Sequence, residues 1–358
     1  MLTWLLRKGR TRTQAFSEYL ASGYTIYRNI GDILAGTGRR ITAHTSLLDF
    51  ASGYGRLTRF LVRDAALQNI TVSDIIPEAV RFQTAHFGVN GVVSTEDPRA
   101  LTIGKRFDVI TCISLFSHLP EASFAQWLTT LLDLCAEDGI LIFTTHPLDH
   151  TPDGGGARFR FVRRSESRLL HPSRYGTSFA SYRFVDGILR ERGIQRIICY
   201  IPKGLNKHQD IYVAGPSAEG TRTVTVQTLP CGCIDAVEIS GDEVRVSGWA
   251  YDPEAGSPVR EARIYRNEKM IGRTQTGLKR EDVAKHLGDP RALHTGFSCA
   301  CRSEFDRTDT VCAAIRGEKT SNLLFYRAHD QQPLRAKLAP AMNALGNLLN
   351  RLTGRRRP

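Results

Sequence analysis

A run of ten residues, Leu47-Leu-Asp-Phe-Ala-Ser-Gly-Tyr-Gly-Arg56, has the composition of a ligand-binding turn. Its apolar start predicts a short strand that ends near the acidic Asp49, and Gly53 and Gly55 follow. Glycine adopts unusual backbone dihedral angles and lets the backbone approach a ligand without a Cβ atom in the way. Asp74 lies 21 positions after Gly53, behind a second predicted strand. A carboxylate there can accept hydrogen bonds from both ribose hydroxyls of an adenosyl ligand.

Two other nucleotide-binding patterns are incomplete in this run. A dinucleotide-binding turn requires G-x-G-x-x-G, whose third glycine lets helix and strand pack closely, and Thr58 stands at that position. The G-x-x-x-x-G-K-[ST] spacing of a phosphate-binding loop is also absent from the run. The glycine pair with its two acids therefore favours an adenosyl ligand over a nicotinamide, a flavin or a triphosphate. An ordinary strand–helix turn without a ligand is the plain alternative.

Alternating strands and helices must position this turn. Apolar residues at spacings of three and four predict a helix over 13–37, and short apolar runs then alternate with helical patterns as far as residue 145. The predicted strands are 46–50, 70–73, 92–94, 107–112 and 139–144, and the predicted helices are 56–64, 78–87 and 124–135. Strands separated by helices of this length form a parallel sheet with helices on both faces. The predicted fold class is α/β, with a doubly wound sheet.

Roughly half of the chain, from about residue 47 to 216, resembles the class I S-adenosylmethionine (SAM) dependent methyltransferase family, which has a Rossmann-like sheet. Asp49, Gly53 and Gly55 match the first motif of that family. Ala51 stands where the motif usually has a glycine, and Asp74 matches its ribose-binding acid. The segments 107–120 and 137–147 resemble the motifs at the fourth and fifth strands of the family.

Two further segments resemble the final antiparallel strand pair of a subgroup that is often encoded with glycan-assembly enzymes. They are Tyr175-Gly-Thr-Ser-Phe-Ala-Ser and His208-Gln-Asp-Ile-Tyr-Val. The resemblance implies that SAM is the cofactor, with Glu96 and Asp97 as candidates for adenine contacts after the third strand. The residues predicted to bind the cofactor are Asp49, Ala51, Gly53, Tyr54, Gly55, Asp74, Ile75 and Ser114.

Histidines near the strand ends are the candidates for acid–base chemistry. Methyl transfer from a sulfonium requires mainly an aligned acceptor and the exclusion of water, but a hydroxyl acceptor also needs a base. His118 follows the fourth predicted strand and His146 ends the fifth, so both should lie at the carboxyl edge, where open α/β sheets bind ligands. We predict that His118 and His146 are catalytic; His171 and His208 are further candidates. A structural or surface role is the alternative for each.

The periodicity of the sequence changes after Pro216. From residue 221 to about 330, alternating apolar residues separated by short turns predict an all-β sandwich. The runs Val246–Pro253, Arg280–Val283 and Thr295–Phe297 resemble a small β-sandwich module that is appended to bacterial glycosyltransferases, methyltransferases and sulfotransferases.

Two C-x-C pairs, Cys231 with Cys233 and Cys299 with Cys301, lie in this region. Four thiolates suffice for a closed zinc site. On a strand, however, this spacing only places both sulfurs of a pair on one face, and cysteine is also a common small core residue. We predict no metal site, and the sequence leaves open whether these four cysteines bind one.

Basic residues concentrate at the two ends of the chain. The net charge is +12, and no acidic residue follows Asp330, whereas six lysines and arginines do. The interior has no basic patch interleaved with aromatic residues, so nucleic acid is not an expected partner. The segment 340–352 predicts an amphipathic helix followed by arginines, a pattern typical of binding to an anionic membrane surface. Docking of this tail onto the protein itself or a partner is the alternative.

No apolar stretch is long enough to span a bilayer, and the N-terminal residues do not resemble a secretory signal. We therefore expect a cytoplasmic protein whose tail would allow peripheral contact with the inner face of the membrane. The expected parts are an N-terminal helical cap (1–40), a SAM-dependent methyltransferase domain (41–216), a β-sandwich (221–330) and a basic amphipathic tail (331–358).

The expected function is methylation of an oxygen on a sugar of a surface polysaccharide or of its lipid-linked precursor. One alternative is a methyltransferase that acts on a small lipid or a secondary metabolite. The other is a non-catalytic scaffold with a degenerate SAM site. The expected partner is accordingly a glycan or small-molecule acceptor, and the sequence identifies neither the acceptor atom nor the oligomeric state.

Overall fold

The computed structural model describes residues 12–148, 158–164, 170–191, 193, 197–206, 208–216, 223–226, 229–267, 269–304, 309–318 and 320–327. The predicted amphipathic tail lies outside the described residues. The chain divides into two compact units, one from Ile26 to Val226 and the other formed by the residues before and after that range. Within the described ranges, no helix combines the length and the apolar character needed to cross a membrane.

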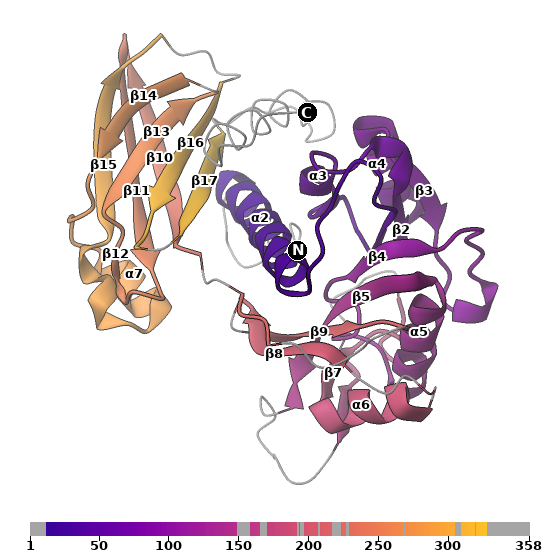
Figure 1. The fold of residues 1–358 in the computed structure, drawn as a ribbon. Coiled ribbons are helices and arrows are strands. Elements are labelled where there is room, and N and C mark those ends of the chain that lie inside the picture. Colours follow the sequence, from indigo (N-terminus) through magenta and orange to yellow (C-terminus); the bar gives the residue numbers. More distant parts are fainter. Residues whose placement is uncertain are drawn as a thin grey trace. The chain divides into compact units, whose positions relative to one another are not determined.

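The first unit contains the predicted alternation of strands and helices (Figure 1). Its parallel strands are β1 (Leu47–Phe50), β2 (Ile70–Asp74), β3 (Asn90–Val93), β4 (Phe107–Cys112) and the long β5 (Cys135–Pro147). Its helices are the second part of α2 (Arg12–Gly36), α3 (Thr58–Leu61), α4 (Pro77–Phe87), α5 (Glu121–Asp133) and α6 (Tyr182–Glu191). The α/β prediction is confirmed, although the helix after the glycine turn is shorter than the predicted 56–64.

Adjacent residues of the central strands pack into two separate apolar cores. Leu48 and Phe50 of β1 join α5 and α6 in one cluster, whereas Leu47 joins α2 and α3 in the other. Because successive side chains of a strand point to opposite faces, both faces of the sheet are buried. This burial explains why the strands have continuous rather than alternating apolar sequences.

The strands follow the order β3-β2-β1-β4-β5, and all four pairings between neighbours are parallel. Beyond β5 lies the antiparallel β9 (Gln209–Ala214), which pairs with residues 141–145 of β5, and β8 (Ile197–Leu205) pairs with β9. The last residues of β5, His146 and Pro147, pair instead with β7 (Thr177–Ala180), whose other neighbour is β6 (Phe159–Val162).

The predicted pairing of the two segments 175–181 and 208–213 is wrong. The first segment forms β7 and pairs with β5 and β6, whereas the second forms most of β9 and pairs with β5 and β8. The sequence between them contains a strand that we did not predict, residues 197–205, which forms a short hairpin with β9. Pairing with a strand that is close in sequence costs little loop-closure entropy, so β9 pairs with the preceding strand β8.

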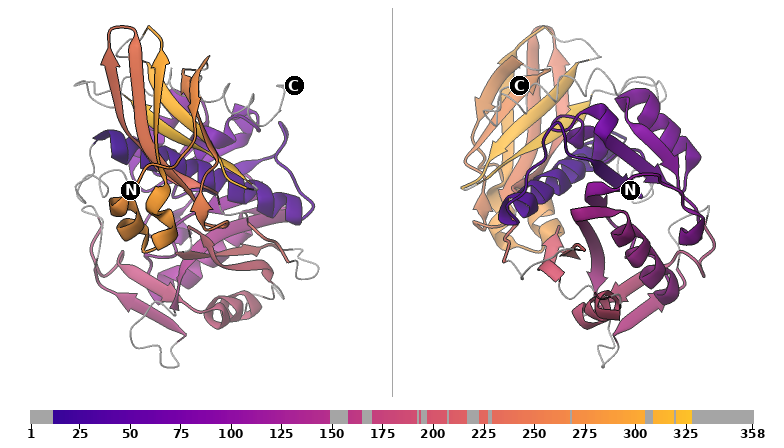
Figure 2. Two further views of the ribbon diagram at one scale, coloured as in Figure 1. Left: turned by 90° about the vertical axis from the view of Figure 1, so that its left-hand side faces the viewer. Right: turned by 45° about the vertical axis from the view of Figure 1, so that its right-hand side comes forward.

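The second unit contains two antiparallel sheets, as predicted for its β-rich sequence (Figure 2). One contains β10 (Cys231–Ser240), β11 (Glu243–Asp252), β12 (Ser257–Pro258) and β15 (Gly296–Arg302). The other contains β13 (Glu261–Arg266), β14 (Lys269–Thr274), β16 (Thr310–Arg316) and β17 (Ser321–Arg327), and α7 (Glu281–Leu287) precedes β15. Residues of both sheets share one apolar core, which defines a sandwich.

The two C-x-C pairs lie on opposite faces of the first of these sheets. Cys231 and Cys233 are opposite Tyr251 and Trp249 of β11, whereas Cys299 and Cys301 are opposite Val246 and Val244. Odd and even residues of a strand face opposite sides, so four sulfurs in this arrangement cannot surround one zinc ion. Cys299 and Cys301 belong instead to the core between the sheets. Among the described residues, no group of three or more metal-ligating side chains is arranged to hold a metal ion.

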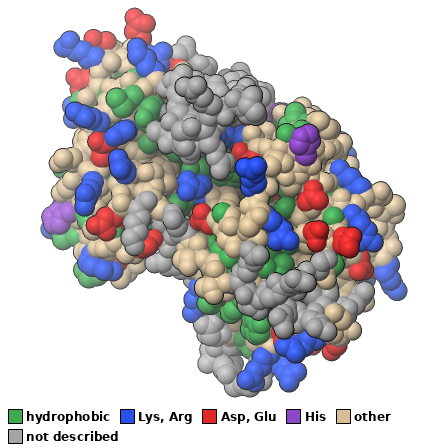
Figure 3. All heavy atoms as spheres, in the orientation of Figure 1, with side chains coloured by type: hydrophobic (Ala, Val, Ile, Leu, Met, Phe, Trp, Pro, Cys, Tyr) green, Lys and Arg blue, Asp and Glu red, His purple; other side chains and the backbone are tan. Residues whose placement is uncertain are grey.

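Charged side chains of both signs are exposed on the face drawn in Figure 3. On the described part of that face, lysines and arginines lie near acidic residues in several places.

Candidate cofactor and acceptor site

The turn after β1 has three residues in the left-handed backbone region. Ala51 has a φ of 55°, Gly53 of 56° and Gly55 of 71°. A Cβ atom at Gly55 would lie 2.5 Å from Cε2 of Phe87 on α4, so this glycine is required both by its dihedral angle and by packing. At Gly53 a Cβ atom would meet no heavy atom within 4 Å, so this part of the turn faces open space. Ala51 holds its conformation at a cost of about 1–2 kcal/mol.

Asp74 ties the end of β2 to this turn. The backbone N–H of Gly53 donates to its Oδ2 at 2.7 Å, and the N–H of Ile76 donates to its Oδ1 at 2.9 Å. The side chain is buried, and this burial raises its pKa above the ordinary 3.8. Each carboxylate oxygen can accept more than one hydrogen bond, so both are able to accept a further one from a ribose hydroxyl. Ile75, the next residue, is half-buried.

Asp49 is buried beneath the turn, with 2% of its surface exposed. The hydroxyl of Thr58, at the start of α3, donates to its Oδ2 at 2.6 Å, and the hydroxyl of Thr111, on β4, donates to its Oδ1 at 3.1 Å. Burial raises the pKa of Asp49 from 3.8 to about 6, against the opposing effect of these hydrogen bonds. An ionised Asp49 would complement a cationic group bound nearby, such as a sulfonium.

Two residues that sequence analysis missed hold the turn in place. Gln83 of α4 is fully buried and donates from Nε2 to the Ser52 hydroxyl and to the Gly53 carbonyl oxygen, both at 2.8 Å. Arg59 of α3 is also buried and donates to the carbonyl oxygens of Gly55 at 2.7 Å and Tyr54 at 3.0 Å. The available signal for Gln83 was its helical spacing from the apolar Ala79 and Val80, which places it on the buried face of α4.

The remaining predicted cofactor residues lie around this turn and the end of β4. Tyr54 is 44% exposed and its ring contacts the edge of Phe82 at 5.6 Å between centroids. Ser114 has a φ of 65°, and its N–H donates to the Thr144 hydroxyl of β5 at 2.9 Å. This contact fixes the backbone just after β4.

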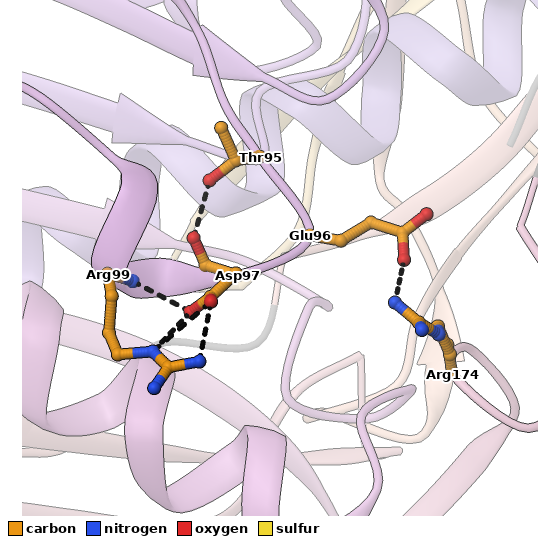
Figure 4. Close-up of polar contacts among 5 residues, drawn as sticks. All are labelled: Thr95, Glu96, Asp97, Arg99 and Arg174. Carbon is orange, nitrogen blue, oxygen red and sulfur yellow. Dashed lines mark hydrogen bonds and ion pairs between the residues drawn. The ribbon is translucent and has the colours of Figure 1, made fainter.

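Glu96 and Asp97, the candidates for adenine contacts, each form an ion pair with an arginine (Figure 4). Asp97 forms an ion pair with Arg99 at 2.7 Å, and the hydrogen bond from Arg99 lowers the pKa of the Asp97 carboxyl. Glu96 pairs at 2.5 Å with Arg174, which comes from the loop before β7. Both pairs are exposed, so water and salt screen the attraction between their charges. Their placement leaves the prediction of adenine contacts untested.

His118 and His146 lie together, with ring centroids 6.3 Å apart. Nδ1 of His118 is 2.8 Å from the carbonyl oxygen of Gly176, and its ring stacks on Tyr175 at 4.6 Å. His146 contacts the ring of Phe179 at 5.6 Å, and its Nε2 is 3.4 Å from Nε2 of Gln209. The other two histidines are exposed: His171 is 2.7 Å from the Ser173 hydroxyl, and His208 lies in the turn between β8 and β9.

The glycine turn and the histidine pair lie at one edge of the sheet. β1, β4 and β5 are consecutive neighbours, and their carboxyl ends carry the turn, His118 and His146 in that order. Because β1 is separated from β5 only by β4, the turn and the two histidines follow adjacent strand ends on the same edge. Open α/β sheets bind ligands at this edge.

Comparison with known proteins agrees with this arrangement. Residues 21–193 match the family described as "Methyltransferase domain". The chain is 30% identical over 125 residues to a protein of Pseudomonas putida named "Probable fatty acid methyltransferase"; the match covers 33% of this chain and spans about a third of that protein (32%).

Similar solved structures include a SAM-dependent methyltransferase from Clostridium acetobutylicum, with 17% identity, coverage of 55% of this chain and 90% of that one, and a TM-score of 0.37. Another is magnesium protoporphyrin IX methyltransferase from Synechocystis with bound SAH. It is 17% identical, the match covers 55% of this chain and 85% of that one, and the TM-score is 0.39.

Residues 21–193 form a class I SAM-dependent methyltransferase domain, and a β-rich region follows it. SAM is the cofactor of this domain. The residues at the turn fit it: Gly53 faces open space, Asp74 retains acceptor capacity for a ribose, and Asp49 is a buried acid suited to a cationic centre.

If Asp74 binds the ribose, Asp74→Ala should weaken SAM binding by about 1–3 kcal/mol, or roughly 5- to 150-fold, because hydrogen bonds to a charged group are lost. Isothermal titration calorimetry measures this change. Glu78→Gln, which alters an exposed acid on the nearby α4, should leave the affinity unchanged. Equal affinities for the wild type and Asp74→Ala would contradict the assignment.

The raised pKa of Asp49 predicts a specific dependence of stability on pH. The folded state holds the proton up to about pH 6, whereas the unfolded chain releases it near 3.8, so folding becomes less favourable as the pH rises through this window. Relative to Asp49→Asn, the wild type should lose about 2–3 kcal/mol of unfolding free energy between about pH 4 and pH 7. Urea unfolding of both proteins measures this difference; a difference that is constant with pH would refute the assignment.

Proposed function

We propose that the protein is a SAM-dependent O-methyltransferase whose acceptor is a sugar hydroxyl of a surface polysaccharide or of its lipid-linked precursor. The observation that carries this proposal is the histidine pair at the same sheet edge as the cofactor turn, with 6.3 Å between the ring centroids. A hydroxyl becomes a good nucleophile only as its proton leaves, and imidazole can accept that proton near neutral pH.

The surroundings of the pair favour a polar acceptor. The hydroxyls of Ser114 and Ser117 and the amide of Gln209 form a hydrogen-bonded group that reaches His146. Side chains of these types are both donors and acceptors, as sugar hydroxyls are. The likeness of the β-rich region to a module found in glycosyltransferases supports a glycan in particular.

The protein's own residues would orient the base and limit its access to water. The Gly176 carbonyl and the Tyr175 ring hold the imidazole of His118 on two sides, and the Phe179 ring packs against His146. When bound, SAM supplies a methyl group that is already strongly electrophilic. The tasks left to the chain are therefore alignment of the acceptor and removal of one proton.

A lipid acceptor is the second candidate, because the relative from Pseudomonas putida is named a probable fatty acid methyltransferase. A fatty acid presents a carboxylate, which is already ionised at neutral pH and needs no base. The two candidates therefore differ in whether the histidine pair is essential.

An assay with methyl-labelled SAM separates the two candidates. The purified protein is incubated with deacylated polysaccharides and sugar nucleotides in one set of reactions and with free fatty acids in the other. We expect label in the sugar fraction that resists mild alkali, because methyl ethers are stable there whereas methyl esters are hydrolysed. Alkali-labile label in the fatty acid fraction would replace our proposal with the lipid candidate.

With a sugar acceptor, His118→Ala and His146→Ala should each reduce turnover about 100-fold or more while SAM affinity stays nearly unchanged. His171→Ala is the matched control, because this exposed histidine lies outside the pair, and it should retain wild-type turnover. Near-normal rates in both of the first two variants would remove these histidines from the mechanism.

A further inference from the structure

The segment 171–176, which precedes β7, is a compact turn that is fixed to His118. Within it, the backbone N–H of Tyr175 donates to the carbonyl oxygen of His171 at 3.0 Å. At its end, the N–H of Gly176 donates to the carbonyl oxygen of His118 at 2.8 Å, and the Gly176 carbonyl oxygen lies 2.8 Å from Nδ1 of the same histidine. The segment therefore has its own hydrogen bonds and is attached to the loop that follows β4.

A side chain of the same segment reaches the loop that follows β3. The guanidinium group of Arg174 forms an ion pair at 2.5 Å with Glu96, as Figure 4 shows. In the loop that carries Glu96, the N–H of Ser94 donates to the carbonyl oxygen of Asp74 at 2.9 Å. Arg174 therefore links the segment 171–176 to a loop that is itself bound to the predicted ribose-binding residue.

The strand order shows what this link spans. His118 follows β4 and Glu96 follows β3, and β1 and β2 lie between these two strands in the sheet. All four strands are parallel, so their carboxyl ends are at one edge. The ends of β1 and β2 carry the glycine turn and Asp74, the residues that fit SAM. The segment 171–176 therefore connects the two sides of the predicted cofactor site.

The ion pair has the properties of a contact that opens readily. The side chain of Arg174 is 71% exposed and that of Glu96 is 47% exposed, so water and salt weaken the attraction between their charges. Exposed pairs of this kind change an equilibrium by at most about fivefold. A methyltransferase must admit SAM and release its demethylated product in each turnover, and a loop that covers a site must open on that time scale.

We propose that the segment 171–176 is a strap over the cofactor and that the ion pair between Arg174 and Glu96 is the latch that holds it closed. Opening of the latch lets SAM enter and its demethylated product leave, and closure also fixes His118 through Gly176. Glu96 is thereby assigned to the latch instead of to the adenine. The proposal rests on the SAM-binding domain and not on the identity of the acceptor.

The rates of SAM binding to the full-length protein test the latch, and surface plasmon resonance measures them. Because the latch does not contact the cofactor, Arg174→Ala should raise the association rate and the dissociation rate alike, by about 2- to 5-fold. The dissociation constant should change by less than about twofold. Arg81→Ala is the matched control, because it removes an ion pair of similar exposure whose partner, Glu78, also lies on α4. Its rates should equal those of the wild type.

Two outcomes of this experiment would overturn the proposal. One is unchanged rates in Arg174→Ala. The other is a rise in the dissociation rate alone, with an equal rise in the dissociation constant, because this result is expected if the pair binds the cofactor directly. At about 1 M NaCl, where the Debye length is about 3 Å, the wild type and Arg174→Ala should have the same rates. A difference that persists at this salt concentration would show that the ion pair is not the latch.

Exchange of the two charges separates the latch from other effects of the substitutions. Arg174→Glu places two carboxylates opposite each other, so both rates should rise further than in Arg174→Ala. Combination of Arg174→Glu with Glu96→Arg restores an ion pair of reversed polarity and should return both rates to values below those of Arg174→Ala. A double variant that is as fast as Arg174→Glu would overturn the latch.

Hydrogen–deuterium exchange tests the strap without any cofactor. In the unliganded full-length protein, Arg174→Ala should speed exchange of the Gly176 amide, which donates to His118, by about 2- to 5-fold. Exchange in α4 should stay at the wild-type rate. Equal exchange of the Gly176 amide in the wild type and in Arg174→Ala would show that the ion pair does not hold the segment, and the proposal would fall.

Discussion

The buried carboxyl group of Asp49 is the constraint around which the cofactor edge is built. Its two oxygens accept from hydroxyls on two different elements, Thr58 at the start of α3 and Thr111 on β4. It therefore fixes β1 to the next helix and to the neighbouring strand at the point where the turn begins. Burial makes its ionised form expensive, as the pKa of about 6 indicates. A site that keeps such a group is suited to a ligand with a positive charge.

The rest of the edge depends on buried polar contacts of the same kind. Asp74, Gln83 and Arg59 hold the turn through its backbone groups, from β2, α4 and α3 respectively. At the other end Gln209 joins the loop after β4 to the end of β5. Buried hydrogen bonds of this kind favour one geometry, because breaking one leaves an unpaired polar group in a medium of low polarity. The chain thus holds its cofactor turn and its histidines by side chains from neighbouring elements.

The features that the sequence predicted are those set by local pattern. The parallel strands, the glycine turn and the positions of Asp49 and Asp74 follow from apolar runs, glycine spacing and the acids at strand ends. His118 and His146 were predicted to lie at the carboxyl edge because they follow the fourth and fifth strands, and in the structure their ring centroids are 6.3 Å apart. In the β-rich region, alternation predicted the sandwich, although only the strand register showed that the four cysteines lie on two faces.

The features that were missed depend on contacts between distant segments. Gln83 and Arg59 are polar residues on helices, where a solvated position is the usual expectation, and only the packed turn explains their burial. The strand 197–205 was missed because Pro202 and Lys203 interrupt its apolar pattern, and without it the partner of β9 was assigned incorrectly. Gln209 carries no motif of its own, and its position near the end of β5 follows only from the antiparallel direction of β9.

The most direct test of this account is calorimetric titration of the full-length protein with SAM in two buffers of different ionisation enthalpy. We expect a dissociation constant in the micromolar range, or about −7 to −8 kcal/mol. If the cationic centre binds beside Asp49, binding at about pH 6 should release up to about half a proton, and at pH 8 almost none. The absence of SAM binding to the folded protein would contradict the account at its centre. Binding without proton release at pH 6 would show that Asp49 does not face the charge of the cofactor.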